Sequence, residues 1–156
     1  MFFFKRKSAT TPTVTSEPSS SRDRYPSTHN PEMASRLPEM ARREDAAIHQ
    51  LYKGLVSLVW AKGEQFPKKH GCWIRVWLDQ AQGLFINMDA YNNCIEIRQG
   101  SGLYDPDSDH SYYLGCEGQT LENLGSDWGG FTRRATPERL EELTTQLTAL
   151  PDGKKA

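Results

Sequence analysis

The feature that most constrains this chain is an alternation of side chains that begins at Cys72. In "CWIRVWLD" (72–79), aliphatic residues and one cysteine occupy every second position. This period of two is typical of a strand with one face in a core, and the segments "LFINMDA" (84–90) and "CIEIRQ" (94–99) continue it. The pattern therefore predicts a three- or four-stranded antiparallel meander, which belongs to an α+β fold if helices cover it.

The residues between these segments predict how the strands pair. A three-residue loop that ends at Gly83, with a positive φ at this glycine, would pair Gln80 with Leu84. A two-residue Asn92-Asn93 turn would pair Tyr91 with Cys94. Both pairings gather apolar side chains on one face, namely Ile74, Val76, Leu78, Ile86, Met88, Ala90, Ile95 and Ile97. The two turns thus predict the same buried face independently.

The same pairings place aromatic and charged side chains in rows on the opposite face. The rows are Trp73 with Tyr91 and Cys94, Arg75 with Asp89 and Glu96, and Trp77 with Asn87 and Arg98. Trp, Tyr and Arg supply most of the energy at protein-binding hot spots, so this face is a candidate surface for a protein partner or for a second copy of the chain. The alternative is that the last helix or the 117–135 loop covers the face and makes it core. Nucleic-acid bases fit less well, because Asp89 and Glu96 put negative charge among the aromatic rings.

Helices are predicted before and after the meander. From Pro38 to Lys62, apolar residues recur at spacings of three, four and seven or eight, with Gly63 as a left-handed cap. Thr136 is a good N-cap for a terminal helix, with Pro137 at its first position and a leucine stripe that runs to Leu150. Residues 38–151 are therefore expected to form one domain, followed by a short tail at 152–156.

The stretch between the third strand and the terminal helix has weaker patterns. The segment "SYYLGC" (111–116) fits a fourth strand, and one short helical turn is expected near 120–124 within a glycine-rich loop. Residues 1–37 are rich in Ser, Thr and Pro and are expected to form a disordered arm.

The first residues, "MFFFKRK", combine aromatic and basic side chains. Phe2, Phe3 and Phe4 could insert at a membrane interface while Lys5, Arg6 and Lys7 meet anionic headgroups, or the segment could dock on a partner. The three cysteines form no CxxC pair, and no apolar run is long enough to cross a bilayer, so a cytoplasmic protein is expected, with peripheral contact at the inner face of a membrane as an extension of that expectation.

An acidic stretch, "GLYDPDSDHSYYLGC" (102–116), is the main candidate for chemistry. Asp105, Asp107 and Asp109 match the first three ligand positions of an EF-hand loop, but His110 stands where that loop needs glycine. These four residues support a metal-dependent hydrolase or transferase as the alternative function, and a solvated turn as the simpler interpretation.

Other constellations are weaker still. A zinc site would need His70, Cys72, His110 and Cys116, and thiol catalysis would need Cys94 or Cys116 beside His110. Arg133 and Arg134 precede the terminal helix, where anions bind well.

The sequence therefore favours a non-enzymatic protein-binding module that acts as an adaptor, a chaperone or an inhibitor of a partner. No cofactor is expected. The formal net charge of −1 argues against broad attraction to nucleic acid.

Overall fold

The computed structural model of the chain describes residues 31–127 and 130–153, with side chains from Arg43 onward. Helix α1 spans Pro31–Lys62 and so begins earlier than the predicted Pro38. The membrane or partner contacts predicted for Phe2, Phe3, Phe4, Lys5, Arg6 and Lys7 lie outside the described residues. The described residues from Arg42 onward form one compact unit. None of the described helices is long and apolar enough to cross a membrane.

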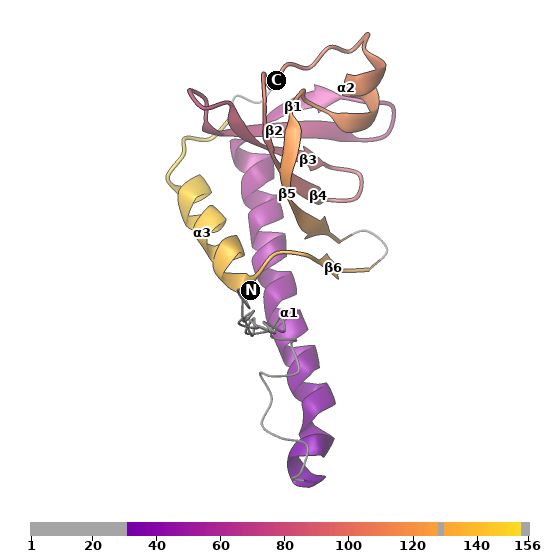
Figure 1. Cartoon of the computed structure of the whole chain (residues 1–156), viewed down its shortest axis with the longest axis vertical. Coiled ribbons are helices and arrows are strands. Elements are labelled where there is room, and N and C mark those ends of the chain that lie inside the picture. The colour runs from indigo at the N-terminus through magenta and orange to yellow at the C-terminus, as the bar shows by residue number, and fades with distance from the viewer. Residues whose placement is uncertain (1–30, 128–129, 154–156) are drawn as a thin grey trace, which may run out of the picture. The chain divides into compact units, whose positions relative to one another are not determined.

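The compact unit contains one antiparallel sheet whose six strands follow one another in sequence order. The strands are β1 Glu64–Pro67, β2 Cys72–Asp79, β3 Leu84–Asp89, β4 Cys94–Gln99, β5 Gln119–Ser126 and β6 Thr132–Arg133, with α2 at Asp109–Leu114 and α3 at Pro137–Thr148. The α+β meander between an N-terminal and a C-terminal helix is confirmed, and the sheet is larger than predicted (Figure 1).

Helices α1 and α3 pack on the aliphatic face of the sheet (Figure 1). The core joins apolar side chains of α1, such as Leu55 and Val59, to Ile74 of β2 and to Leu143 and Leu147 of α3. Helix α3 begins as predicted, because the Thr136 hydroxyl accepts a hydrogen bond from the Arg139 N–H at 3.2 Å. The sequence pattern therefore assigned the buried face correctly.

Both strand pairings differ from the predicted ones by two residues. Ile74 lies opposite Met88 instead of Ala90, and Ile95 also lies opposite Met88. The reason is that both loops are longer than predicted, since Asp79 pairs with Leu84 and Asp89 with Cys94, which leaves loops at 80–83 and 90–93. Gly83 has the predicted positive φ of 66°, and Asn93 has a φ of 51°. Because both registers differ from the predicted ones by two residues, β2 and β4 keep their predicted alignment with each other, and only the residues of β3 change rows.

Four local expectations were wrong. The segment predicted as a fourth strand forms helix α2, and the helical turn expected near 120–124 is part of strand β5. Strand β1 lies between the first helix and Cys72, where no strand was predicted. Gly63 does not have a positive φ, and the reason for a glycine there is packing, because a Cβ would overlap Ile74 Cγ2.

Candidate functional site

The sheet face opposite α1 and α3 is covered by the chain's own segment 101–118, which includes α2. The observed rows are Trp73 with Asp89 and Cys94, Arg75 with Asn87 and Glu96, and Trp77 with Phe85 and Arg98. Trp73 is 6% exposed, Asn87 1% and Arg98 5%. Of the two alternatives that the sequence left open, the covered core is therefore the one observed, and most of the cover precedes the 117–135 loop that the sequence suggested.

The cover is held by hydrogen bonds from buried polar side chains to its backbone. The Asn87 amide nitrogen donates to the Leu114 carbonyl at 3.2 Å, and its oxygen accepts from the Cys116 N–H at 3.1 Å. The Arg98 guanidinium donates to the same Leu114 carbonyl and, at 3.1 Å, to the Cys116 carbonyl. Glu96 balances the charge of Arg98 from the same strand. These contacts satisfy polar groups that would be costly to bury alone.

Arg75 stabilises the other end of the cover. Its guanidinium lies 5.0 Å from the ring centroids of both Phe66 and Trp77, pairs with Glu64 at 2.7 Å and donates to the Gly102 carbonyl. Arg75 does not lie beside Asp89 as predicted, because β3 pairs in a register that differs by two residues. Asp89 lies opposite Trp73 and forms an ion pair with Lys68 at 2.6 Å. Of the binding residues predicted on this sheet face, Tyr91 alone is strongly exposed, at 55%.

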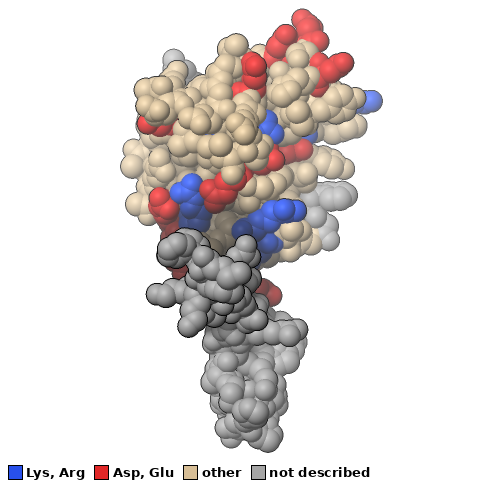
Figure 2. All heavy atoms as spheres, viewed as in Figure 1, with Lys and Arg blue, Asp and Glu red and all other residues tan. Residues whose placement is uncertain are grey.

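The acidic stretch does not assemble a metal site. Asp105, Asp107 and Asp109 are all exposed, and the Asp105 carboxylate accepts from the backbone N–H of Asp107, which is a solvated turn before α2. Acidic side chains gather at the end of the molecule where this loop lies (Figure 2). Asp105 and His110 do line a cavity of about 470 Å³, but Asp107 and Asp109 do not. Within residues 31–127 and 130–153, no three His, Cys, Asp or Glu side chains lie close enough together to hold a metal ion.

The predicted zinc and thiol sites are not assembled either. Cys72 packs against the helix-covered core, whereas Cys116 lies on the other face beneath the cover, so the sheet separates them. Burial raises the pKa of all three thiols, and that of Cys116 rises to about 11 even though Arg75 and Arg98 lie near it. A nucleophilic cysteine needs a lowered pKa, so none of these thiols is activated.

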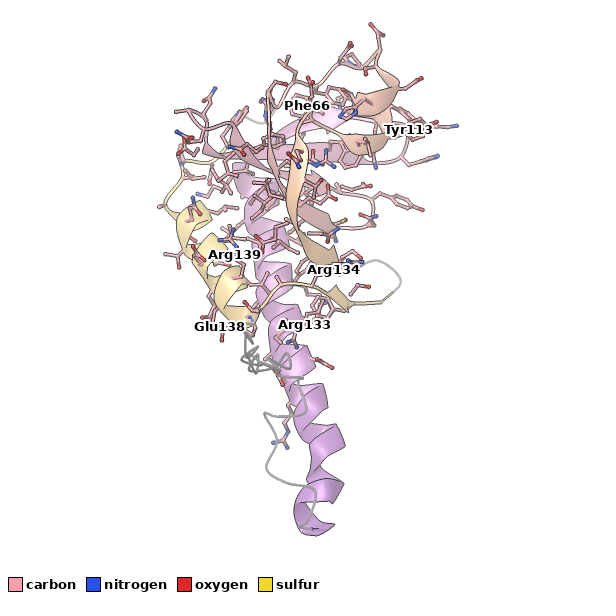
Figure 3. The ribbon with its side chains drawn as sticks, viewed as in Figure 1. Phe66, Tyr113, Arg133, Arg134, Glu138 and Arg139 are labelled. Carbon is pink, nitrogen blue, oxygen red and sulfur yellow. The ribbon has the colours of Figure 1, made fainter. Side chains whose placement is uncertain are left out.

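One of the two arginines of the predicted anion site, Arg133, is paired with carboxylates of the protein itself. Arg133 lies 3.9 Å from Glu44 and 3.8 Å from Asp45, both on α1. Arg134 is exposed beside it, at the end of β6 (Figure 3).

A site that the sequence did not suggest lies beside the cover, where three separate segments meet. A cavity of about 290 Å³, called the tyrosine groove below, is lined by Lys68, Lys69, His70, Tyr91, Tyr112 and Tyr113. Tyr113 is 70% exposed and lies on α2, on the other side of the sheet from α3 in Figure 3. Tyr91 extends from the β3–β4 loop, and the two lysines and the histidine from the β1–β2 turn.

The groove has aromatic walls and a basic rim. The rings of Tyr112 and Tyr113 meet edge to face at 4.8 Å, and the His70 ring lies 6.5 Å from that of Tyr91. Lys68 is held over the Trp73 ring at 4.3 Å by its ion pair with Asp89. Such a surface can pack an apolar side chain while phenol and ammonium groups donate hydrogen bonds to an acceptor.

The sequence contained two signals for this groove, "KKHG" (68–71) and the Tyr112-Tyr113 doublet. In the strand that was predicted for 111–116, neighbouring side chains would point to opposite faces. In α2 the two tyrosines are about 100° apart around the helix, so both reach the groove.

Comparisons with protein-family models, with curated proteins and with solved structures give no match to this chain.

Proposed function

We propose that the protein is a non-enzymatic protein-binding module that holds a segment of a partner protein in the tyrosine groove, in the role of an adaptor, a chaperone or an inhibitor. The observation that carries this proposal is the exposure of Tyr91 and Tyr113, at 55% and 70%, on two walls of one cavity. Tyrosine is enriched at binding hot spots because its ring buries a large area while its hydroxyl finds a partner.

The size of the groove favours a protein segment over a whole small molecule. A volume of about 290 Å³ is at the lower limit of the roughly 300–1,000 Å³ that is typical of ligand pockets. A cavity of this size accommodates a few side chains of a longer segment, whose remainder lies on the surrounding surface. Leu114, which is 47% exposed and follows Tyr113, extends the apolar surface at the C-terminal end of α2.

The residues of the covered sheet face have a supporting role in this proposal. Trp73 and Asn87 fix α2 through the Tyr112 and Leu114 carbonyls, at 3.4 and 3.2 Å. A rigid α2 keeps the tyrosines in place before binding, which lowers the entropic cost of association.

The test places a photo-crosslinking amino acid at Tyr113 and, as a control, at Leu121, which is exposed on β5 and does not line the groove. A protein that crosslinks only through position 113 is then identified, purified and titrated. We expect Tyr91→Ser and Tyr113→Ser each to weaken its binding by about tenfold, since hot-spot truncation costs at least 1–2 kcal/mol, and Leu121→Ser to leave it unchanged. Equal binding by all three variants would refute the proposal.

A further inference from the structure

We infer that the tyrosine groove selects partner segments that carry carboxylates next to an apolar residue. This inference rests on the proposed function and adds the chemistry of the occupant. None of the six residues that line the groove is acidic, and three of them are lysine or histidine. Charge complementarity therefore points to an acidic segment.

Lys69 is the side chain that would recognise the carboxylate. Lys68 already binds Asp89 at 2.6 Å, so its charge is balanced within the protein. Lys69 is exposed and makes no ion pair within the part of the chain that the structure describes. Its charge is therefore available to an incoming carboxylate. Tyr112 and Tyr113 line the same cavity, and a tyrosine hydroxyl can serve as an additional donor.

The turn that carries Lys69 is fixed against the groove. The Lys68 N–H donates to the Gly71 carbonyl at 3.4 Å, and Gly71 has a φ of 83°. Gly71 also packs on the backbone of Tyr91, since a Cβ there would lie 3.5 Å from the Tyr91 nitrogen. The cationic rim and the aromatic wall are thus parts of one rigid surface. They can therefore bind a carboxylate and an apolar side chain that stand at a fixed spacing in a partner segment.

An acidic protein segment fits this surface better than a single-stranded nucleic acid does. Stacking platforms for bases are accompanied by a positively charged groove that follows the backbone. Here the positive charge is confined to one turn, and Asp89 lies directly beside it.

The experiment uses three synthetic peptides labelled with fluorescein. They share Leu and Tyr anchor residues and carry Glu, Gln or Lys between them, and a labelled oligo-dT strand is the fourth probe. We expect the full-length protein to bind the Glu peptide about tenfold tighter than the Gln peptide, because one or two partly exposed ion pairs add of order 1 kcal/mol each. Lys69→Glu should reverse the preference towards the Lys peptide. Lys53→Glu is the matched control, because it makes the same charge change at an exposed site on α1 and should leave the preference unchanged.

Three outcomes count against the inference in different ways. Equal binding of the Glu and Gln peptides, both weakened by Tyr113→Ser, would overturn the acidic preference and leave the groove as a binding site. Binding that Tyr113→Ser does not affect, or no binding of any peptide, would overturn both proposals. Tighter binding of oligo-dT than of the Glu peptide would replace the protein segment with a nucleic acid.

Discussion

The side-chain amide oxygen of Asn87, on β3, accepts a hydrogen bond from the backbone N–H of Cys116 at 3.1 Å. The nitrogen of the same amide donates to the Leu114 carbonyl. One side chain therefore bonds both a backbone N–H and a backbone carbonyl of the cover, as a neighbouring strand would. Because Asn87 is 1% exposed, water cannot replace these bonds if they are lost.

Asn87→Ala should therefore lower the free energy of unfolding by about 2–4 kcal/mol, since the buried Cys116 N–H loses its acceptor, the Leu114 carbonyl loses one of its two donors and a cavity remains. Urea unfolding followed by tryptophan fluorescence measures this change. Gln82→Ala, in the exposed β2–β3 loop, is the control and should change stability by less than about 0.5 kcal/mol. Similar losses in both variants would contradict the role given to Asn87.

Gly115→Ala tests how tightly the cover approaches the sheet. A Cβ at this position would lie 2.5 Å from Asn87 Oδ1 and 2.8 Å from Trp73 Cδ2, and the backbone has a φ of 84°. We expect a loss of about 2–4 kcal/mol, because both the overlap and the left-handed backbone are unfavourable for alanine. Gly54→Ala is the matched control. Apart from the neighbouring residues and backbone of α1 itself, no atom lies within 4 Å of its Cβ position, so it should stabilise the protein by about 0.5–1 kcal/mol.

Trp73 is buried in the covered sheet face, whereas Tyr113 is exposed and lines the groove, so substitutions at the two positions should affect stability differently. Trp73→Ala should cost about 3–5 kcal/mol of unfolding free energy, as is usual for a buried aromatic residue. Tyr113→Ala should cost less than about 0.5 kcal/mol, because its ring is largely exposed. Chemical denaturation of the two variants decides the matter, and a Trp73→Ala protein as stable as the parent would mean that the cover is open in solution.

Tyr52 joins α1 to three backbone groups of the sheet. Its hydroxyl lies 2.5 Å from the Asn93 carbonyl and 2.6 Å from the Gly125 carbonyl, and it accepts from the Ile95 N–H at 3.3 Å. Tyr52→Phe should therefore cost about 1–3 kcal/mol, because the Ile95 N–H and at least one carbonyl lose their partner in the core.

Tyr113→Phe is the control for Tyr52→Phe, because it removes an exposed hydroxyl and should be neutral. Amide hydrogen exchange at Ile95 provides the second measurement, since its protection should fall in Tyr52→Phe only. Unchanged stability and protection would show that the buried hydroxyl contributes nothing.

Cys116 predicts how stability depends on alkaline pH. Burial raises the pKa of this thiol to about 11, against about 9 when it is not perturbed. Below about pH 9 the Cys116 thiol keeps its proton in both the folded and the unfolded chain. Between about pH 9 and pH 11 the thiol loses its proton in the unfolded chain but keeps it in the folded one. The free energy of unfolding should therefore fall as the pH rises from about 9, with a contribution of up to about 1.4 kcal/mol per pH unit from this group.

Urea unfolding at a series of pH values from 8 to 10 checks this contribution. The slope should be shallower in Cys116→Ala than in the parent protein, and some slope should remain because burial also raises the pKa of Cys72 and Cys94. Parallel curves would show that Cys116 is not the group responsible.

The sequence alone determined which face of the three strands between Cys72 and Gln99 packs against the helices, and where the terminal helix begins. The alternation from Cys72 and the Thr136-Pro137 pair depend on neighbouring residues, and the structure shows the expected core and cap. The strand pairing was missed by two residues, because a shift of two preserves the inward face and no local pattern opposes it.

Only the tertiary structure decided what lies on the other face of the sheet. The pattern of 111–116 predicted a strand, yet Asn87 and Arg98 both bind the Leu114 carbonyl at the end of α2 and so favour a helix there. The β1–β2 turn, the β3–β4 loop and helix α2, which are distant in sequence, then meet to form the tyrosine groove. Hydrogen bonds and packing between such distant residues are not encoded in any short stretch of sequence, and for this reason the covered face and the groove became visible only in the folded chain.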